Sequence, residues 1–144
     1  MENPNRNPAE GPALLGQCLC GDTAYRVSPP YDRVEVCHCM QCRRSNGSAL
    51  HMVVPVEEGQ VEWLGREAIT EYESSPGKIR AFCGRCGSPV YSRRESRPGN
   101  LRLRAGLILD LPQPAELVQQ YGEFALPWIA PLARMVETPE KETE

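Results

Sequence analysis

The chain has 144 residues, enough for one domain with a modest core and too few for two ordinary domains. Only 40% of the residues are hydrophobic and 6% are aromatic, so a staple such as a bound metal would help to stabilise the fold. The formal net charge is −3, and both ends of the chain are acidic. The body is therefore close to neutral, which gives no electrostatic case for broad nucleic-acid binding.

The two ends of the chain are polar and rich in proline or charge, with little to bury. We expect residues 1–12 and 133–144 to be disordered tails, and residues 13–132 to form the single domain. The N-terminus lacks the basic and then apolar layout of a signal peptide. No apolar run approaches the roughly 20 residues needed to span a bilayer. We therefore expect a cytoplasmic protein with no membrane partner.

Short runs with strand character, separated by turn residues, follow one another along the chain. They cover residues 22–27, 48–56, 60–64, 68–73, 79–82, 89–93 and 100–109. Ser75-Pro-Gly77 places Pro and Gly at the centre of a type II turn. Residues 115–122 fit either a short helix or a late strand. Many short strands with regular turn signals predict an all-β domain.

The run that starts at Asn100 alternates apolar and basic residues in its first half. In a strand, successive side chains point to opposite faces. We therefore expect Leu101 and Leu103 to face the core, and Arg102 and Arg104 to face solvent.

Seven cysteines form three clusters: Cys18 with Cys20, Cys37 with Cys39 and Cys42, and Cys83 with Cys86. In a reducing compartment, clustered cysteines are metal ligands more often than disulfides, and an odd number would leave one thiol without a partner. Cys83-x-x-Cys86-Gly is a zinc-knuckle pattern, because the turn aims both sulfurs at one metal. Cys18 and Cys20 point to one face of an extended strand. These two pairs predict a closed, structural four-cysteine zinc site.

Cys37, Cys39 and Cys42 then remain as three zinc ligands with an open fourth position, the pattern of catalytic zinc. If Cys37 and Cys39 share one strand face, His38 points to the other face, and we expect it to be a hydrogen-bonded histidine. His51 and the carboxylates stay open as a fourth ligand. A partition that adds one cysteine from another pair to the middle cluster would leave that pair incomplete. A single iron–sulfur cluster also fits seven cysteine ligands poorly.

An open zinc can polarise a carbonyl oxygen or hold a thiolate at neutral pH. Three thiolates outweigh the charge of the dication, which favours exchange with a soft sulfur ligand or work on a carbonyl over activation of water. Nearby cations would help to bind an anionic substrate. Arg43 and Arg44 follow Cys42 directly and are the predicted substrate-binding residues, and three further arginines flank the knuckle, Arg80, Arg93 and Arg94.

The sequence resembles the glutathione-dependent formaldehyde-activating enzyme family, which includes centromere protein V. The resemblance extends over residues 14–130. It rests on segments 16–21, 37–48, 72–77, 82–89 and 105–110, the second of which reads CHCMQCRRSNGS. It implies a single-domain β-tent of twisted antiparallel sheets. It also implies a structural zinc on Cys18, Cys20, Cys83 and Cys86 and an active-site zinc on Cys37, Cys39 and Cys42.

The expected function is that of a zinc-dependent carbon–sulfur lyase with two Zn²⁺ per chain. Like the family's S-(hydroxymethyl)glutathione synthase activity, it would join a small thiol such as glutathione to an aldehyde such as formaldehyde. The alternative is a non-enzymatic zinc module that binds a protein or a nucleic acid. This hypothesis is based on the arginines from Arg93 to Arg104.

Overall fold

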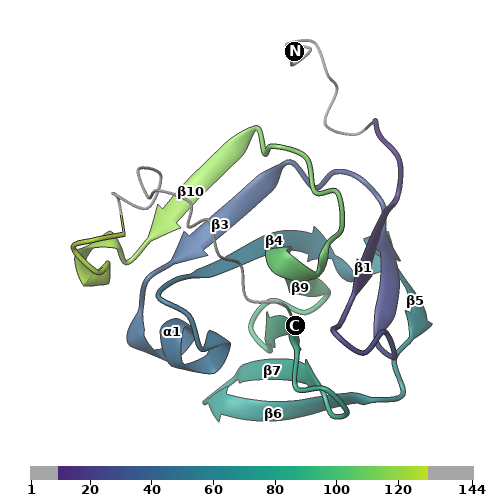
Figure 1. The fold of residues 1–144 in the computed structure, drawn as a ribbon, viewed down its shortest axis with the longest axis horizontal. Helices are drawn as coiled ribbons and strands as arrows, with labels where there is room; N and C mark the ends of the chain where they lie inside the picture. The colour runs from purple at the N-terminus through teal and green to yellow at the C-terminus, as the bar shows by residue number, and fades with distance from the viewer. Residues whose placement is uncertain (1–9, 130–144) are drawn as a thin grey trace, which may run out of the picture.

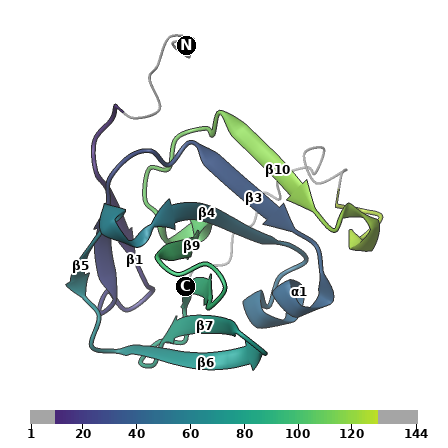
Figure 2. The same ribbon diagram turned by 180° about the vertical axis from the view of Figure 1, so that it is seen from behind.

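The computed structural model describes residues 10–129, which fold into two β-sheets and one short α-helix (Figures 1 and 2). The small sheet has the strand order β1-β2-β5, with β1 (Leu14–Gln17), β2 (Ala24–Val27) and β5 (Val61–Gly65). The predicted tails 1–12 and 133–144 lie outside these residues, apart from residues 10–12. No helix within residues 10–129 is long and apolar enough to cross a lipid bilayer.

The large sheet has seven strands in the order β10-β3-β4-β9-β8-β7-β6. In that order they are β10 (Glu116–Gln120), β3 (Arg33–Cys37), β4 (His51–Glu57), β9 (Asn100–Arg104), β8 (Pro89–Arg94), β7 (Lys78–Cys83) and β6 (Ile69–Ser75). The helix α1 (Met40–Asn46) connects β3 to β4. The sheet bends strongly, and α1 lies between its upper part, β3 and β4, and the hairpin β6–β7 (Figure 1).

The core is formed by apolar side chains from both sheets. Tyr25 and Val27 of the small sheet are fully buried with Val54 and Leu103 of the large one. Trp63 links the two groups, with ring centroids 5.4 Å from Tyr25 and 5.9 Å from Tyr91. A few large rings thus fill the space between the sheets, which suits a chain with so few aromatic residues.

The all-β prediction is confirmed, and every predicted strand has a counterpart. Residues 115–122 form the strand β10, while the strand predicted over 100–109 ends at Arg104 and continues as the 3₁₀ turn η2 (Ala105–Leu107). Two further 3₁₀ turns are η1 (Glu58–Gln60) and η3 (Gly122–Phe124). The strands β1 and β3 and the helix α1 were not predicted from the sequence. The helix ends where Gly47 adopts φ 63° and its N–H bonds the carbonyl of Arg43, a glycine signal that was readable in the sequence.

One strand pair departs from the antiparallel pattern that the resemblance implies. β10 runs parallel to β3, with Gln120 opposite Cys37. The segment after β9 returns across the molecule and places the end of β10 beside the end of β3. The residues that follow Gln120 therefore lie close to the middle cysteine cluster.

The predicted alternation of buried and exposed residues along β9 is correct for the leucines and wrong for the arginines. Leu101 and Leu103 are buried in the core, as expected, but Arg104 is only 4% exposed and Arg102 is partly buried. The prediction that both arginines face solvent is wrong, because the bent sheet folds this face over other parts of the molecule. Glu35 of β3 pairs with Arg102, and His51 of β4 contacts Arg104.

Gly16 provides a test of the packing of the two sheets. It lies opposite Tyr25 in the β1–β2 pair, and a Cβ at position 16 would lie 2.3 Å from the Tyr25 ring. We expect Gly16→Ala to lower the free energy of unfolding by about 1–3 kcal/mol, because a fully buried ring has no room to move. Urea unfolding measures it. Gly59→Ala, where no atom lies within 4 Å of the added Cβ, is the control. Equal stability of the two variants would contradict this packing.

Candidate functional site

Cys18, Cys20, Cys83 and Cys86 come together although 63 residues separate Cys20 from Cys83. Their sulfurs all lie within 4.8 Å of one another, with 3.5 Å between Cys18 and Cys20 and 3.8 Å between Cys20 and Cys83. Zinc–sulfur bonds of about 2.3 Å in a regular tetrahedron would place the sulfurs about 3.8 Å apart. The residues present therefore fit a closed tetrahedral zinc site.

Two turns, rather than a strand and a turn, aim these four sulfurs. Cys18 and Cys20 lie in the connection between β1 and β2, where Gly21 has φ 85° and donates to the carbonyl of Cys18. Gly87, with φ 81°, closes the knuckle by donating to the carbonyl of Cys83. The glycine expected after the second knuckle cysteine thus adopts the conformation that only glycine takes at low cost. Hydrogen bonds from the side chain and backbone of Ser88 lower the pKa of Cys86 to about 5, which favours a thiolate ligand.

Cys37, Cys39 and Cys42 form a second group, whose sulfurs also lie within 4.8 Å of one another. Cys37 ends β3, Cys39 is the N-cap of α1, and Cys42 lies in the first turn of that helix. The Cys39 sulfur accepts from the N–H of Cys42 at 3.4 Å. No other histidine, cysteine or carboxylate within residues 10–129 joins this group. All seven cysteines are free thiols and form no disulfide.

The two histidines stand outside the group. His38 is buried, and its Nε2 lies 3.1 Å from the side-chain oxygen of Gln119, which confirms the hydrogen-bonded histidine expected from the sequence. His51 lies opposite Cys37 on β4, and its Nε2 lies 3.0 Å from a guanidinium nitrogen of Arg104. A guanidinium only donates, so Nε2 accepts and His51 carries its proton on Nδ1. Burial, and then the charge of Arg104, lower the pKa of His51 to about 3.

The three-cysteine group faces a cavity of about 450 Å³. Met40, Tyr121 and Phe124 give the wall an apolar part. The opposite part is cationic, with Lys78 and Arg80 from β7, Arg94 from β8 and Arg102 from β9. Strand register explains this grouping, since Lys78 is opposite Arg94 and Ser92 is opposite both Arg80 and Arg102. Alternate residues of three neighbouring strands therefore present one polar face.

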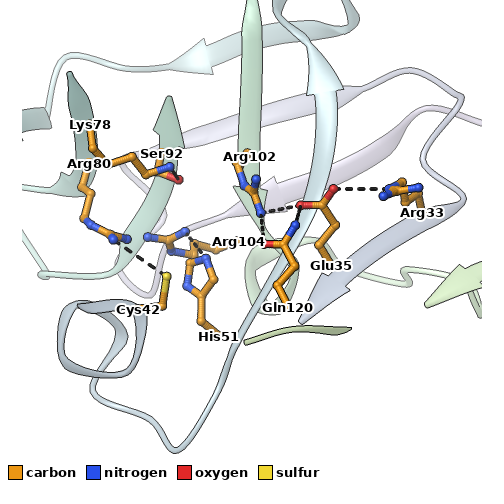
Figure 3. A network of polar contacts seen from close by, with 10 residues as sticks. All are labelled: Arg33, Glu35, Cys42, His51, Lys78, Arg80, Ser92, Arg102, Arg104 and Gln120. Atoms are coloured by element: carbon orange, nitrogen blue, oxygen red, sulfur yellow. Dashed lines mark hydrogen bonds and ion pairs between the residues drawn. The ribbon is translucent and has the colours of Figure 1, made fainter. Parts of the chain in front are cut away.

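Hydrogen bonds hold these cations in place (Figure 3). Arg80 donates from Nε to the Ser74 hydroxyl at 2.9 Å, and another of its nitrogens lies 3.8 Å from the Cys42 sulfur. Arg102 pairs with Glu35 and contacts Gln120. Glu35 is the one carboxylate paired with a cavity cation among residues 10–129. The excess of positive charge makes the cavity suited to an anionic ligand.

The predicted substrate-binding residues lie elsewhere. Arg43 and Arg44 are on α1, and neither lines the cavity, so their role in binding stays a prediction. Of the arginines that flank the knuckle, Arg80 and Arg94 line the cavity, while Arg93 pairs with Glu71 at 2.9 Å. Sequence reasoning missed Lys78 and Arg102. The signal for both was the two-residue period of Lys78 with Arg80 and of Arg102 with Arg104.

Comparison with known proteins was made at three levels. The model of a family described as glutathione-dependent formaldehyde-activating enzyme matches residues 13–123. A search of curated proteins found no match. Among solved structures, the crystal structure of a Rhodobacter sphaeroides protein, a structural-genomics target, superposes with a TM-score of 0.59. It is 20% identical in sequence, and the alignment covers 74% of this chain and 99% of that one. At this identity, the structural likeness shows the fold alone.

The two cysteine groups predict different responses to serine substitution. We expect the purified chain to hold two zinc ions and Cys42→Ser to hold one, with little change in thermal unfolding, because that group lies at the surface of a cavity. Cys83→Ser should lose the other zinc and unfold at a lower temperature, because its group joins two distant turns. Metal analysis measures the zinc content of each variant, and circular dichroism measures its unfolding temperature. Unchanged metal content in Cys42→Ser would remove the three-cysteine group as a metal site.

Proposed function

The chain belongs to the glutathione-dependent formaldehyde-activating enzyme family, and on this basis we propose that it is a zinc-dependent carbon–sulfur lyase. It joins a small thiol, such as glutathione, to an aldehyde, such as formaldehyde, in the cavity beside Cys37, Cys39 and Cys42. The observation that carries the proposal is the three-cysteine group, which no fourth side chain of the described residues completes and which opens on a cavity.

Cys37, Cys39 and Cys42 would hold the zinc, and their donor set fits it, as three soft sulfurs with one side left open. When bound, this metal supplies a Lewis-acidic position that favours the thiolate form of a substrate thiol at neutral pH. Arg80, beside the Cys42 sulfur, offsets part of the negative charge of the three thiolates.

The rest of the cavity binds and orients the substrates. Arg94 and Arg102 on its wall suit the carboxylates of a peptide-like thiol, because a guanidinium pairs with a carboxylate through two parallel hydrogen bonds. Met40, Tyr121 and Phe124 form the apolar part of the wall, against which the carbon atoms of a substrate can pack. The reaction forms one carbon–sulfur bond, and the proton that the thiol loses ends on the former carbonyl oxygen.

Only part of the arginine run that motivated the alternative, a zinc module that binds a protein or a nucleic acid, is free to contact such a partner. Of the arginines between Arg93 and Arg104 that prompted it, Arg104 is buried, Arg102 pairs with Glu35, and Arg93 pairs with Glu71. Both ion pairs include a carboxylate and so offer little charge to a phosphate backbone, while Arg94 and Arg97 are exposed and form no ion pair within residues 10–129.

Magnetisation-exchange NMR of formaldehyde with glutathione tests the proposal. We expect the zinc-loaded protein to accelerate the exchange in proportion to its concentration, and Cys42→Ser to return it to the uncatalysed rate. Arg97→Gln, at an exposed position away from the cavity, is the control and should retain the wild-type rate. Equal exchange rates with and without wild-type protein would rule out this pair of substrates.

A further inference from the structure

Lys78 is a buried amine with no carboxylate partner. Lys78 is 6% exposed, and its Nζ lies 3.0 Å from the hydroxyl of Ser92. It forms no ion pair with the described residues, 10–129. A buried cation without a counter-ion costs free energy. Lys78 lines the same cavity as the three cysteines, so a function there would account for this cost.

The charged groups that face Lys78 are mostly cations. Arg80 comes from its own strand, Arg94 from β8 and Arg102 from β9, while Cys42 of α1 opposes them. From β6 it meets Ser75, its partner in the hairpin, and the hydroxyl of Ser74 donates to its carbonyl oxygen. The nearest acid of that strand, Glu73, accepts instead from the N–H of Gly77. Burial, and then the charges of Arg102, Arg94 and Arg80, lower the pKa of Lys78 to about 8.

Lys78 differs chemically from the cations around it. The chain has 14 arginines and 2 lysines, so an amine is the exception in its basic residues. A guanidinium keeps its proton at any physiological pH, while an amine can release and regain one. Among the other lining residues, His51 has its Nε2 occupied by Arg104, and Cys37, Cys39 and Cys42 are the expected metal ligands. Lys78 is thus the cavity cation that can move a proton.

We propose that Lys78 is the catalytic acid–base residue of the thiol–aldehyde reaction, an inference that rests on the function proposed above. The amine takes the proton as the S–H bond of the thiol breaks. The sulfur then forms a bond to the carbonyl carbon, and the electron pair of the broken C=O π bond moves to oxygen. The ammonium returns the proton to that oxygen, which yields the hydroxymethyl thioether and the original amine. No oxidant or reductant is needed.

Two substitutions separate proton transfer from simple attraction of an anion. Lys78→Arg keeps the positive charge but cannot release a proton, whereas Lys78→Gln removes the charge as well. We expect both variants to lower kcat by about 100-fold, the size typical of a lost acid–base group. The KM for the thiol should change little in Lys78→Arg. Lys141→Arg, the same substitution at the other lysine, is the matched control and should leave kcat unchanged.

The pH dependence gives the second readout. Once the uncatalysed rate is subtracted, kcat/KM of the wild type should rise with pH to a break near 8, because the neutral amine accepts the thiol proton. This break should be absent in Lys78→Arg. Wild-type kcat and the same break in Lys78→Arg would overturn the inference and leave Lys78 as an anion-binding residue. No acceleration by the wild type would instead refute the proposed function, and the inference with it.

Competitive labelling of amines, followed by mass spectrometry, checks Lys78 without any enzymatic reaction. Its acetylation by acetic anhydride as a function of pH should show a midpoint near 8 in the folded protein and near its ordinary value of about 10.4 in urea. A folded-state midpoint equal to that in urea would also overturn the proposal.

Discussion

The fold brings the four sulfurs of Cys18, Cys20, Cys83 and Cys86 within 4.8 Å of one another, and a metal held there would be the long-range link on which the rest of the fold depends. Such a metal would join the turn between β1 and β2 to the turn between β7 and β8, and so attach the small sheet to the large one. The chain has few large apolar side chains, and its core relies on a small set of rings such as Tyr25 and Trp63. A metal at this point would provide stability that such a core does not supply by itself, because metal binding adds directly to the free energy of folding.

The position of β7 connects this link to the cavity. Cys83 ends β7 at the four-cysteine group, and Lys78 and Arg80 near its other end face the three-cysteine group. Alternation then gives the large sheet two different faces, with Leu101 and Leu103 in the core and the cations on the other side. The bend of the sheet brings α1 over that polar face, so that Arg80 meets Cys42 (Figure 3).

The sequence predicted the features that depend on local spacing, and missed those that depend on tertiary packing. The partition of the seven cysteines followed from their spacing and from a count of ligands, and both groups assemble as expected. Arg104 was placed in solvent because period-two alternation shows which residues share a face and says nothing about what covers that face. Arg43 and Arg44 are next to Cys42 in sequence, but neither lines the cavity, whose cationic part is built by strands β7, β8 and β9 from distant positions. The parallel pairing of β10 with β3 likewise depends on a long connection that no local pattern encodes.

The central claim is that one cysteine group closes on a metal while the other holds a metal with one side open to the cavity. Anomalous diffraction from crystals of the zinc-loaded protein, recorded on both sides of the zinc edge, tests it most directly. The account predicts two anomalous peaks per chain, one enclosed by Cys18, Cys20, Cys83 and Cys86 and one bound by Cys37, Cys39 and Cys42 alone among protein side chains. A single peak in the first group, or a fourth protein ligand such as His51 on the second, would contradict it.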